Sequence, residues 1–114
     1  MRIVNLQQFL TLPSGTLYQR YKPSVAESLE IKWDNCGERD WVLQDLEGIG
    51  IIENNGSDQL FERLDDMQHN CASYPAAFDF AGRDGCARGD EMFLVYERDD
   101  VARLIKTLQD LPNQ

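Results

Sequence analysis

The residue patterns that would identify a membrane, secreted or metal-binding protein are scarce in this sequence. Within its 114 residues, no apolar run approaches the length of about 18 that a transmembrane helix needs. The start, Met1–Asn5, leads into polar Gln7 and Gln8 and lacks the apolar stretch of a signal peptide. Three cysteines are an odd number, without pairwise metal or disulfide spacing. These absences predict a reduced, cytoplasmic protein without a membrane partner.

Motifs for catalysis are also missing. The sequence contains no P-loop, no Gly-x-Gly-x-x-Gly and no Ser/His/Asp order. A catalytic cysteine needs a histidine to accept the thiol proton, and His69 is the only histidine. Zinc needs four ligands at recognisable spacing, which Cys36, Cys71, Cys86 and His69 do not show, so only their convergence in space would form a site. The sequence assigns no catalytic residue, no metal ligand and no cofactor.

Acidic residues, in contrast, are abundant and unevenly distributed. Twenty acidic and eleven basic residues give a net charge of −9. Residues 1–26 contain no acid and carry +3, so residues 27–114 carry −12. Such a body repels phosphates, which disfavours direct nucleic-acid binding, and is attracted to basic protein surfaces. The alternative is that the acidity only keeps a small protein soluble.

Length and patterning predict a single α+β domain over residues 1–114. Hydrophobic residues make up 42% and charged residues 27%, a typical globular balance. The expected order is α-β-β-β-α-β-β-α, a small antiparallel sheet with about three helices packed on it. Strands are expected over residues 16–21, 29–33, 41–46, 78–80 and 92–96, with a further strand or sheet edge at 49–52.

Caps and apolar spacing predict the three helices. Asn5 and Gln8 form a capping-box pattern at the first helix. Ser57 is placed to cap the second helix, and Asp99 and Asp100 open the third. The predicted core stripe of the second helix is Leu60, Phe61, Leu64 and Met67.

The second predicted helix carries the first candidate site. Its acids lie opposite the apolar stripe, and Asp58 and Glu62 stand about 6 Å apart along the axis. Like charges at this spacing repel, and no lysine intervenes. Such a row imitates a phosphate backbone and fits a groove lined by Lys and Arg; a merely solvated helix face is the alternative. The candidate partner-binding residues are Asp58, Glu62, Asp65 and Asp66.

A glycine-punctuated loop from Gly82 to Glu91 is the second candidate site. Long loops on a scaffold often carry recognition. A plain hairpin connection, whose glycines supply positive φ, is the alternative. The candidate partner-binding residues in this loop are Arg83, Asp84, Arg88, Asp90 and Glu91.

Aromatic and basic residues alternate in the acid-free N-terminal part. Tyr18 and Tyr21 stand beside Arg20 and Lys22. Such neighbours form either a contact patch for a partner or a cover for the acidic body of the same molecule. Trp33 and Trp41 flank the first predicted hairpin and are interpreted as core.

Three stretches together carry a resemblance to a known family. They are Leu12-Pro13-x-Gly15-Thr16-Leu17-Tyr18; Asp40-Trp41 with Gln44-Asp45-Leu46; and Gly82-Arg83-Asp84-Gly85 with Met92-Phe93-x-Val95-Tyr96-Glu97 and Asp100-Val101. The chain resembles a family of uncharacterised small acidic bacteriophage and prophage proteins over nearly its whole length. The resemblance implies a site of action in the cytosol of an infected bacterium and transfers no catalytic residues.

The first functional hypothesis is therefore a non-enzymatic phage protein that inhibits a host factor by occluding a basic, nucleic-acid-binding surface. An anti-CRISPR or other anti-defence role is its most specific form. A small enzyme acting on a nucleotide or a host protein, with a site among the loop acids and His69, is the second. A self-associating virion accessory protein is the third. The sequence does not fix the oligomeric state, and a dimer is compatible with each hypothesis.

Overall fold

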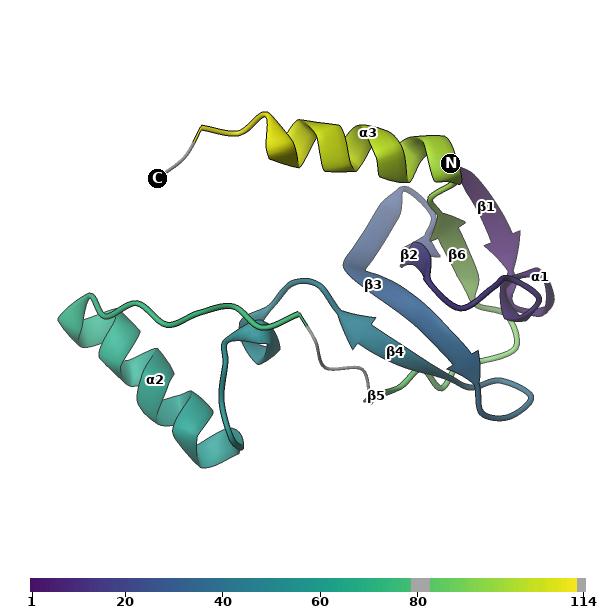
Figure 1. The fold of residues 1–114 in the computed structure, drawn as a ribbon. Coiled ribbons are helices and arrows are strands. Elements are labelled where there is room, and N and C mark those ends of the chain that lie inside the picture. Colours follow the sequence, from purple (N-terminus) through teal and green to yellow (C-terminus); the bar gives the residue numbers. More distant parts are fainter. Residues whose placement is uncertain (79–82, 113–114) are drawn as a thin grey trace.

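The computed structural model describes residues 1–78 and 83–112. Over these residues the chain forms a six-stranded antiparallel sheet with three α-helices attached (Figure 1). The expected α+β class is confirmed. The strands follow one another across the sheet in the order β1-β6-β2-β3-β4-β5. They are β1 (Arg2–Asn5), β2 (Thr16–Lys22), β3 (Val25–Asn35), β4 (Trp41–Asp45), β5 (Arg83–Asp84) and β6 (Met92–Val95).

The helices are α1 (Leu6–Leu10), α2 (Ser57–Asn70) and α3 (Arg98–Gln109), with a short 3-10 helix η1 (Ile49–Ile51). The capping box of α1 is confirmed, because the Asn5 side chain accepts from the Gln8 amide at 2.8 Å and Gln8 Oε1 accepts from the Asn5 amide at 3.0 Å. At α2 the predicted cap is wrong. Gly56 precedes the helix, Ser57 is its first residue, and no side chain caps it.

Several local predictions need correction. Strand β1 was not expected; it forms by pairing with β6 from the other end of the chain. The expected strand at residues 49–52 is the helix η1, followed by one bridge from Ile52 to Ala76. Phe78 lies in an exposed connection, and the rest of the strand expected at 78–80 is outside the described residues. The glycine loop contains the short strand β5.

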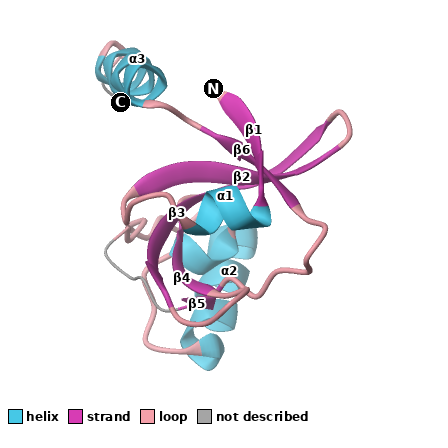
Figure 2. Ribbon diagram, turned by 90° about the vertical axis from the view of Figure 1, so that its right-hand side faces the viewer, coloured by secondary structure: helices cyan, strands magenta, loops and turns pink. Residues whose placement is uncertain are grey.

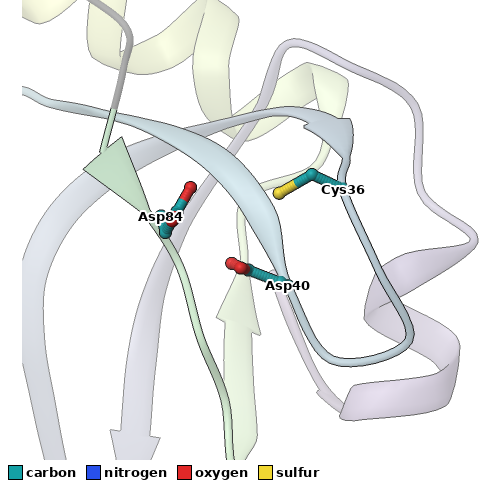
Figure 3. Close-up of side chains that lie close together, drawn as sticks. All are labelled: Cys36, Asp40 and Asp84. Carbon is teal, nitrogen blue, oxygen red and sulfur yellow. The ribbon is translucent and has the colours of Figure 1, made fainter.

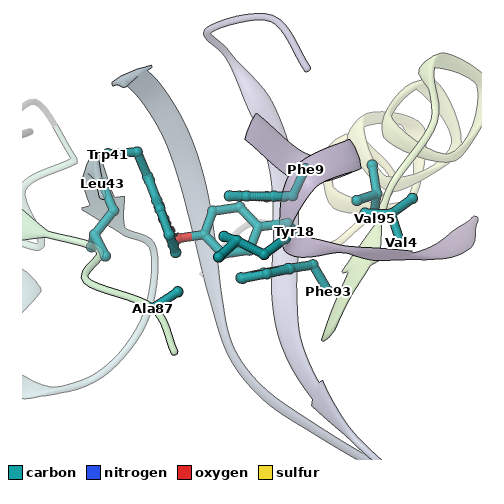
Figure 4. Packing of buried hydrophobic residues seen from close by; sticks show 9 residues of the cluster. Val4, Phe9, Tyr18, Trp41, Leu43, Ala87, Phe93 and Val95 are labelled. Carbon is teal, nitrogen blue, oxygen red and sulfur yellow. Dashed lines mark hydrogen bonds between the residues drawn. The ribbon is translucent and has the colours of Figure 1, made fainter. Parts of the chain in front are cut away.

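An aromatic cluster forms the core between α1 and one face of the sheet (Figure 4). Phe9 of α1 stacks on Phe93 of β6 with ring centroids 4.1 Å apart, and Trp41 of β4 meets Phe93 edge-on at 5.5 Å. Offset and edge-on aromatic contacts of this kind add to the free energy gained from burying apolar surface. The core residues are Val4, Leu6, Phe9, Tyr18, Trp41, Leu43, Ala87, Phe93 and Val95.

A hydrogen-bonded chain makes polar atoms compatible with this core. Trp41 Nε1 donates to the Tyr18 hydroxyl at 2.9 Å, and that hydroxyl donates to Glu30 Oε1 at 2.8 Å. Because the ring is buried and Glu30 lies against it, the pKa of Tyr18 is raised far above its ordinary value. Tyr18 is therefore a core residue, and the contact-patch interpretation is wrong for it. Trp41 is fully buried as predicted, whereas Trp33 is half-buried and donates to Gln44 at 3.1 Å.

Strand β3 places a charged residue of its alternating pattern inside the protein. Lys32 is only 2% exposed, whereas the neighbouring Ile31 and Trp33 are half-buried. The Lys32 ammonium donates to the carbonyls of Leu12 at 3.0 Å and Trp33 at 3.2 Å. These bonds replace water around the buried charge, and burial lowers the pKa of Lys32.

Helices α2 and α3 project from the sheet (Figures 1 and 2). The radius of gyration is 16.1 Å, against about 13 Å for a compact domain of this length. Phe61 of α2 is 64% exposed, so the prediction that it belongs to a core stripe is wrong. On α3, the apolar Ile105 and Leu108 are each at least half exposed, as is Leu111 just after the helix. Among the described residues, no helix has the length and apolar character needed to cross a membrane.

Gly85 gives a test of the core packing. A Cβ at this position would overlap the indole ring of Trp41, which is held on its other sides by the aromatic cluster. We expect Gly85→Ala to lower the unfolding free energy by about 1–3 kcal/mol, the usual cost of overpacking. Urea unfolding measures this change. Gly89→Ala is the matched control, because its new Cβ would meet only Arg39 Nη1 at 3.9 Å; equal losses in both variants would contradict the packing.

Candidate functional site

The exposed face of α2 is the first candidate site. Asp58, Phe61, Glu62 and Asp65 are all exposed and follow one another at i, i+3, i+4 and i+7. At 3.6 residues per turn, this spacing places the four side chains on one contiguous face. The face therefore combines three carboxylates with one large apolar ring.

Local contacts hold α2 away from the sheet in a defined position. The segment after α2 runs back along η1, where the Glu53 amide donates to the Pro75 carbonyl at 2.9 Å and the Ala77 amide to the Ile51 carbonyl at 2.6 Å. Arg63 packs over the Tyr74 ring at 4.7 Å and forms an ion pair with Glu53 at 3.8 Å. One side of the helix is thus fastened to its own return segment, and the acidic side is left to solvent.

Asp66 differs from the other three acids predicted on this helix. Its carboxylate accepts from the Tyr74 hydroxyl at 2.5 Å and from Asn70 at 2.8 Å. These hydrogen bonds lower the pKa of Asp66 and raise that of Tyr74. Asp66 therefore fastens the helix to its return segment. Asp65 lies 3.3 Å from His69 Nε2, an exposed i, i+4 pair.

Four of the five loop residues predicted to bind a partner lie beside other side chains of the protein. Arg88 and Asp90 pair with each other at 3.3 Å, which lowers the pKa of Asp90 and raises that of Arg88. Glu91 pairs with Arg20 at 2.8 Å. Asp84 lies beside Cys36 and Asp40, whereas the side chain of Arg83 and the residue Gly82 are outside the described residues.

The two predicted sites are not brought together. Figure 1 shows α2 at one side of the molecule, apart from the connection that runs from β5 to β6. His69 belongs to α2, so it does not join the loop acids. The acid/base site expected for the enzyme hypothesis, with His69 among those acids, is not formed in the described structure.

Arg20 and Lys22, the basic residues of β2, pair with acids of the same chain. This is one of the two alternatives that the sequence left open for these residues. Arg20 packs over the Trp41 ring at 5.2 Å, besides its ion pair with Glu91, and donates to the Gly85 carbonyl. Lys22 pairs with Glu27 at 3.1 Å. The contacts of Arg20 with Gly85 and Glu91 fasten the connection before β6 to the sheet.

A pair of carboxyl groups on neighbouring strands was not found by sequence reasoning. Glu30 of β3 and Asp45 of β4 are directly opposite each other in the sheet and line a cleft with Arg20 and Glu47. Burial raises the pKa of Glu30, and Asp45 raises it further, against the lowering effects of Tyr18 and Arg20. The register of the hairpin creates this pair, and no spacing in the sequence indicates it.

Cys36, Asp40 and Asp84 form a second cluster that the sequence did not indicate (Figure 3). Cys36 follows β3, Asp40 precedes β4 and Asp84 ends β5, and one ligating atom from each lies within 4.8 Å of the others. Burial, followed by the charges of the two carboxylates, raises the pKa of the Cys36 thiol. The cluster contains a single cysteine, so the spacing between cysteines in the sequence could not indicate it.

No protein-family model, curated protein or solved structure matches the chain.

Glu30 makes the stability of the protein depend on pH. Its pKa is higher in the folded than in the unfolded chain, so Glu30 releases a proton on unfolding at pH values between the two. Protonated Glu30 therefore stabilises the folded protein. This contribution to the unfolding free energy is complete below the ordinary pKa of 4.5 and is lost as pH rises through the pKa of Glu30 in the folded protein. We expect Glu30→Gln to flatten this fall of unfolding free energy above pH 4.5, measured by urea unfolding at a series of pH values.

Glu47→Gln, on the rim of the same cleft, is the control and keeps the wild-type slope. Identical slopes in wild type and Glu30→Gln would contradict the assignment.

Proposed function

We propose that the chain is a non-enzymatic binding protein that occludes a basic surface of another protein through the exposed face of α2. The observation that carries the proposal is the position of Phe61. Its ring is 64% exposed and stands among Asp58, Glu62 and Asp65. Interfaces typically combine a central aromatic anchor with a charged rim. A basic surface with an apolar depression is complementary to this face.

The remaining charge distribution supports α2 over the loop. In the loop, Arg88 offsets Asp90 and Arg20 offsets Glu91. On α3, Lys106 pairs with Asp110 at 3.0 Å. Helix α2 has four acids against Arg63 alone when His69 is neutral, and Arg63 packs on the opposite side of the helix against Tyr74. Attraction to a basic partner is therefore strongest at α2.

The resemblance to phage proteins gives this proposal its biological setting. In the cytosol of an infected bacterium, basic surfaces of this kind belong to host proteins that bind nucleic acid. Occlusion of such a surface would inhibit the host protein, and an anti-CRISPR or other anti-defence role is the most specific form. Electrostatic attraction would accelerate association and would weaken as salt screens it.

Charge reversal on α2 tests the proposal. The tagged protein is used to capture partners from bacterial lysate at about 0.1 M salt, followed by elution at about 0.5 M. We expect a stoichiometric partner with a basic surface, and its loss when Asp58, Glu62 and Asp65 are all replaced by Lys. With the purified partner, Phe61→Ala should lower affinity at least about tenfold, the size of a hot-spot effect.

A second triple variant controls for net charge. Replacing Glu38, Glu47 and Asp99 by Lys changes the net charge equally, from −9 to −3, and all three residues are exposed. This variant should keep most of the affinity, because its changes lie outside α2. The proposal fails if nothing is retained at either salt concentration, or if both triple variants lose the partner equally.

Self-association is a second candidate function, favoured by the apolar face of α3. Ile105 and Leu108 lie at i and i+3 of α3 and are 50% and 57% exposed, and Leu111, which follows the end of the helix at Gln109, is 58% exposed. Apolar side chains that follow one another along a helix are unusual on a monomeric surface and often mark a contact with another chain.

Sedimentation velocity over a range of concentrations tests this candidate. Self-association through α3 predicts a dimer or larger species that Leu108→Lys converts to monomer. Thr107→Lys is the control, because Thr107 is an exposed polar neighbour on the same helix. A monomer at every concentration would exclude the second candidate and leave the first unchanged.

A further inference from the structure

The cluster of Cys36, Asp40 and Asp84 brings together side chains that are separate in the sequence. Cys36 and Asp40 stand at the two ends of the turn between β3 and β4, whereas Asp84 arrives from β5, more than forty residues later. The thiol sulfur and one oxygen of each carboxylate lie within 4.8 Å of one another (Figure 3). Because Zn–S and Zn–O bonds are about 2.3 and 2.0–2.2 Å long, small side-chain rotations from this arrangement would bring all three atoms to a single ion.

Backbone hydrogen bonds hold the three segments around this point. Asp40 Oδ1 accepts from the amides of Trp41 and Cys86, each at 2.8 Å. The Cys36 amide donates to the Asp40 carbonyl at 3.1 Å, and the Gly85 amide donates to the Trp41 carbonyl at 2.7 Å. Since Trp41 is fully buried, the aromatic core fixes the strand that follows Asp40.

No basic side chain within the described part of the protein offsets the charge of these two carboxylates. Among the described side chains, which do not include that of Arg83, neither Asp40 nor Asp84 forms an ion pair with Lys, Arg or His, whereas Asp90 and Glu91 of the same connection both do. Two carboxylates side by side repel each other, and a cation between them removes this repulsion.

We propose that Cys36, Asp40 and Asp84 bind a divalent metal ion of the zinc class. Mg²⁺ and Ca²⁺ prefer ligand sets made only of oxygen, whereas Zn²⁺ and Co²⁺ accept cysteine sulfur together with carboxylate oxygen. On binding, a metal–sulfur bond replaces the S–H bond of Cys36, and the thiol proton passes to the solvent. Three protein ligands leave the fourth tetrahedral position open to water or an external group. The site lies on the sheet and is independent of the binding function proposed for α2.

Differential alkylation tests the site in the unmodified protein. All three cysteines are exposed, so each should react with iodoacetamide after reduction and removal of metal. We expect Zn²⁺ to protect Cys36 and to leave Cys71 and Cys86 reactive, with EDTA restoring the reaction and Mg²⁺ giving no protection. Peptide mass spectrometry reads each cysteine separately. Equal labelling of Cys36 with and without Zn²⁺, or protection of Cys71 or Cys86 instead, would overturn the proposal.

A titration with Co²⁺ tests the complete ligand set. Binding should produce a thiolate-to-cobalt charge-transfer band together with visible bands of tetrahedral intensity. Cys36→Ser should remove the charge-transfer band, and Asp84→Asn should weaken Co²⁺ binding by more than about tenfold, since even loss of an outer-shell partner costs this much.

Cys71→Ser and Asp90→Asn are the matched controls and should bind Co²⁺ as the wild type does. A charge-transfer band that survives Cys36→Ser, or equal weakening in Asp84→Asn and Asp90→Asn, would overturn the site. Circular dichroism without metal confirms that each variant is folded. If Cys36→Ser does not fold, the alkylation result for the unmodified protein decides between the outcomes.

Discussion

The buried indole of Trp41 is the contact on which most of the structure depends. Its ring packs against Phe9 and Phe93, and its Nε1 donates to Tyr18, which in turn holds Glu30. Its other face leaves room only for a glycine at position 85. The core, the hairpin of β3 and β4 and the connection leading to β6 therefore share one side chain. Burial of the aromatic surface supplies free energy of folding. The hydrogen bonds from Trp41 to Tyr18 and from Tyr18 to Glu30 offset the cost of burying polar atoms.

This arrangement also places the chemistry of the molecule. Asp40 precedes Trp41 and Asp84 precedes Gly85, so the contact between Trp41 and Gly85 brings two carboxylates to the thiol of Cys36. The same contact brings the loop within reach of Arg20, which offsets Glu91. Some acids near the sheet are thus offset by a basic side chain, as Glu91 is by Arg20, and others are gathered together, as Asp40 and Asp84 are. Helix α2 lies outside this network, and its Asp58, Glu62 and Asp65 are exposed to solvent.

Sequence reasoning was most accurate where structure arises from neighbouring residues. The capping box of Asn5 and Gln8, the strands around Leu17 and Phe93 and the positions of all three helices depend on contacts within a few residues. It failed where an element or a side chain depends on residues that are distant in the sequence. Strand β1 exists because β6 lies beside it, and η1 replaces a strand because the chain turns there toward α2. Lys32 is buried because carbonyls of Leu12 and Trp33 surround its ammonium, which alternation along β3 does not reveal.

Periodicity, capping and composition are local properties, and they were sufficient to predict the α+β class, the helix boundaries to within a few residues and the concentration of acids after residue 26. The sequence also located the acids on α2. The tertiary structure alone decided that Phe61 is exposed among them, that Glu30 faces Asp45, and that Cys36 meets Asp40 and Asp84. Each of these juxtapositions depends on strand register or on how an element packs, and both are set by contacts between residues far apart in the chain.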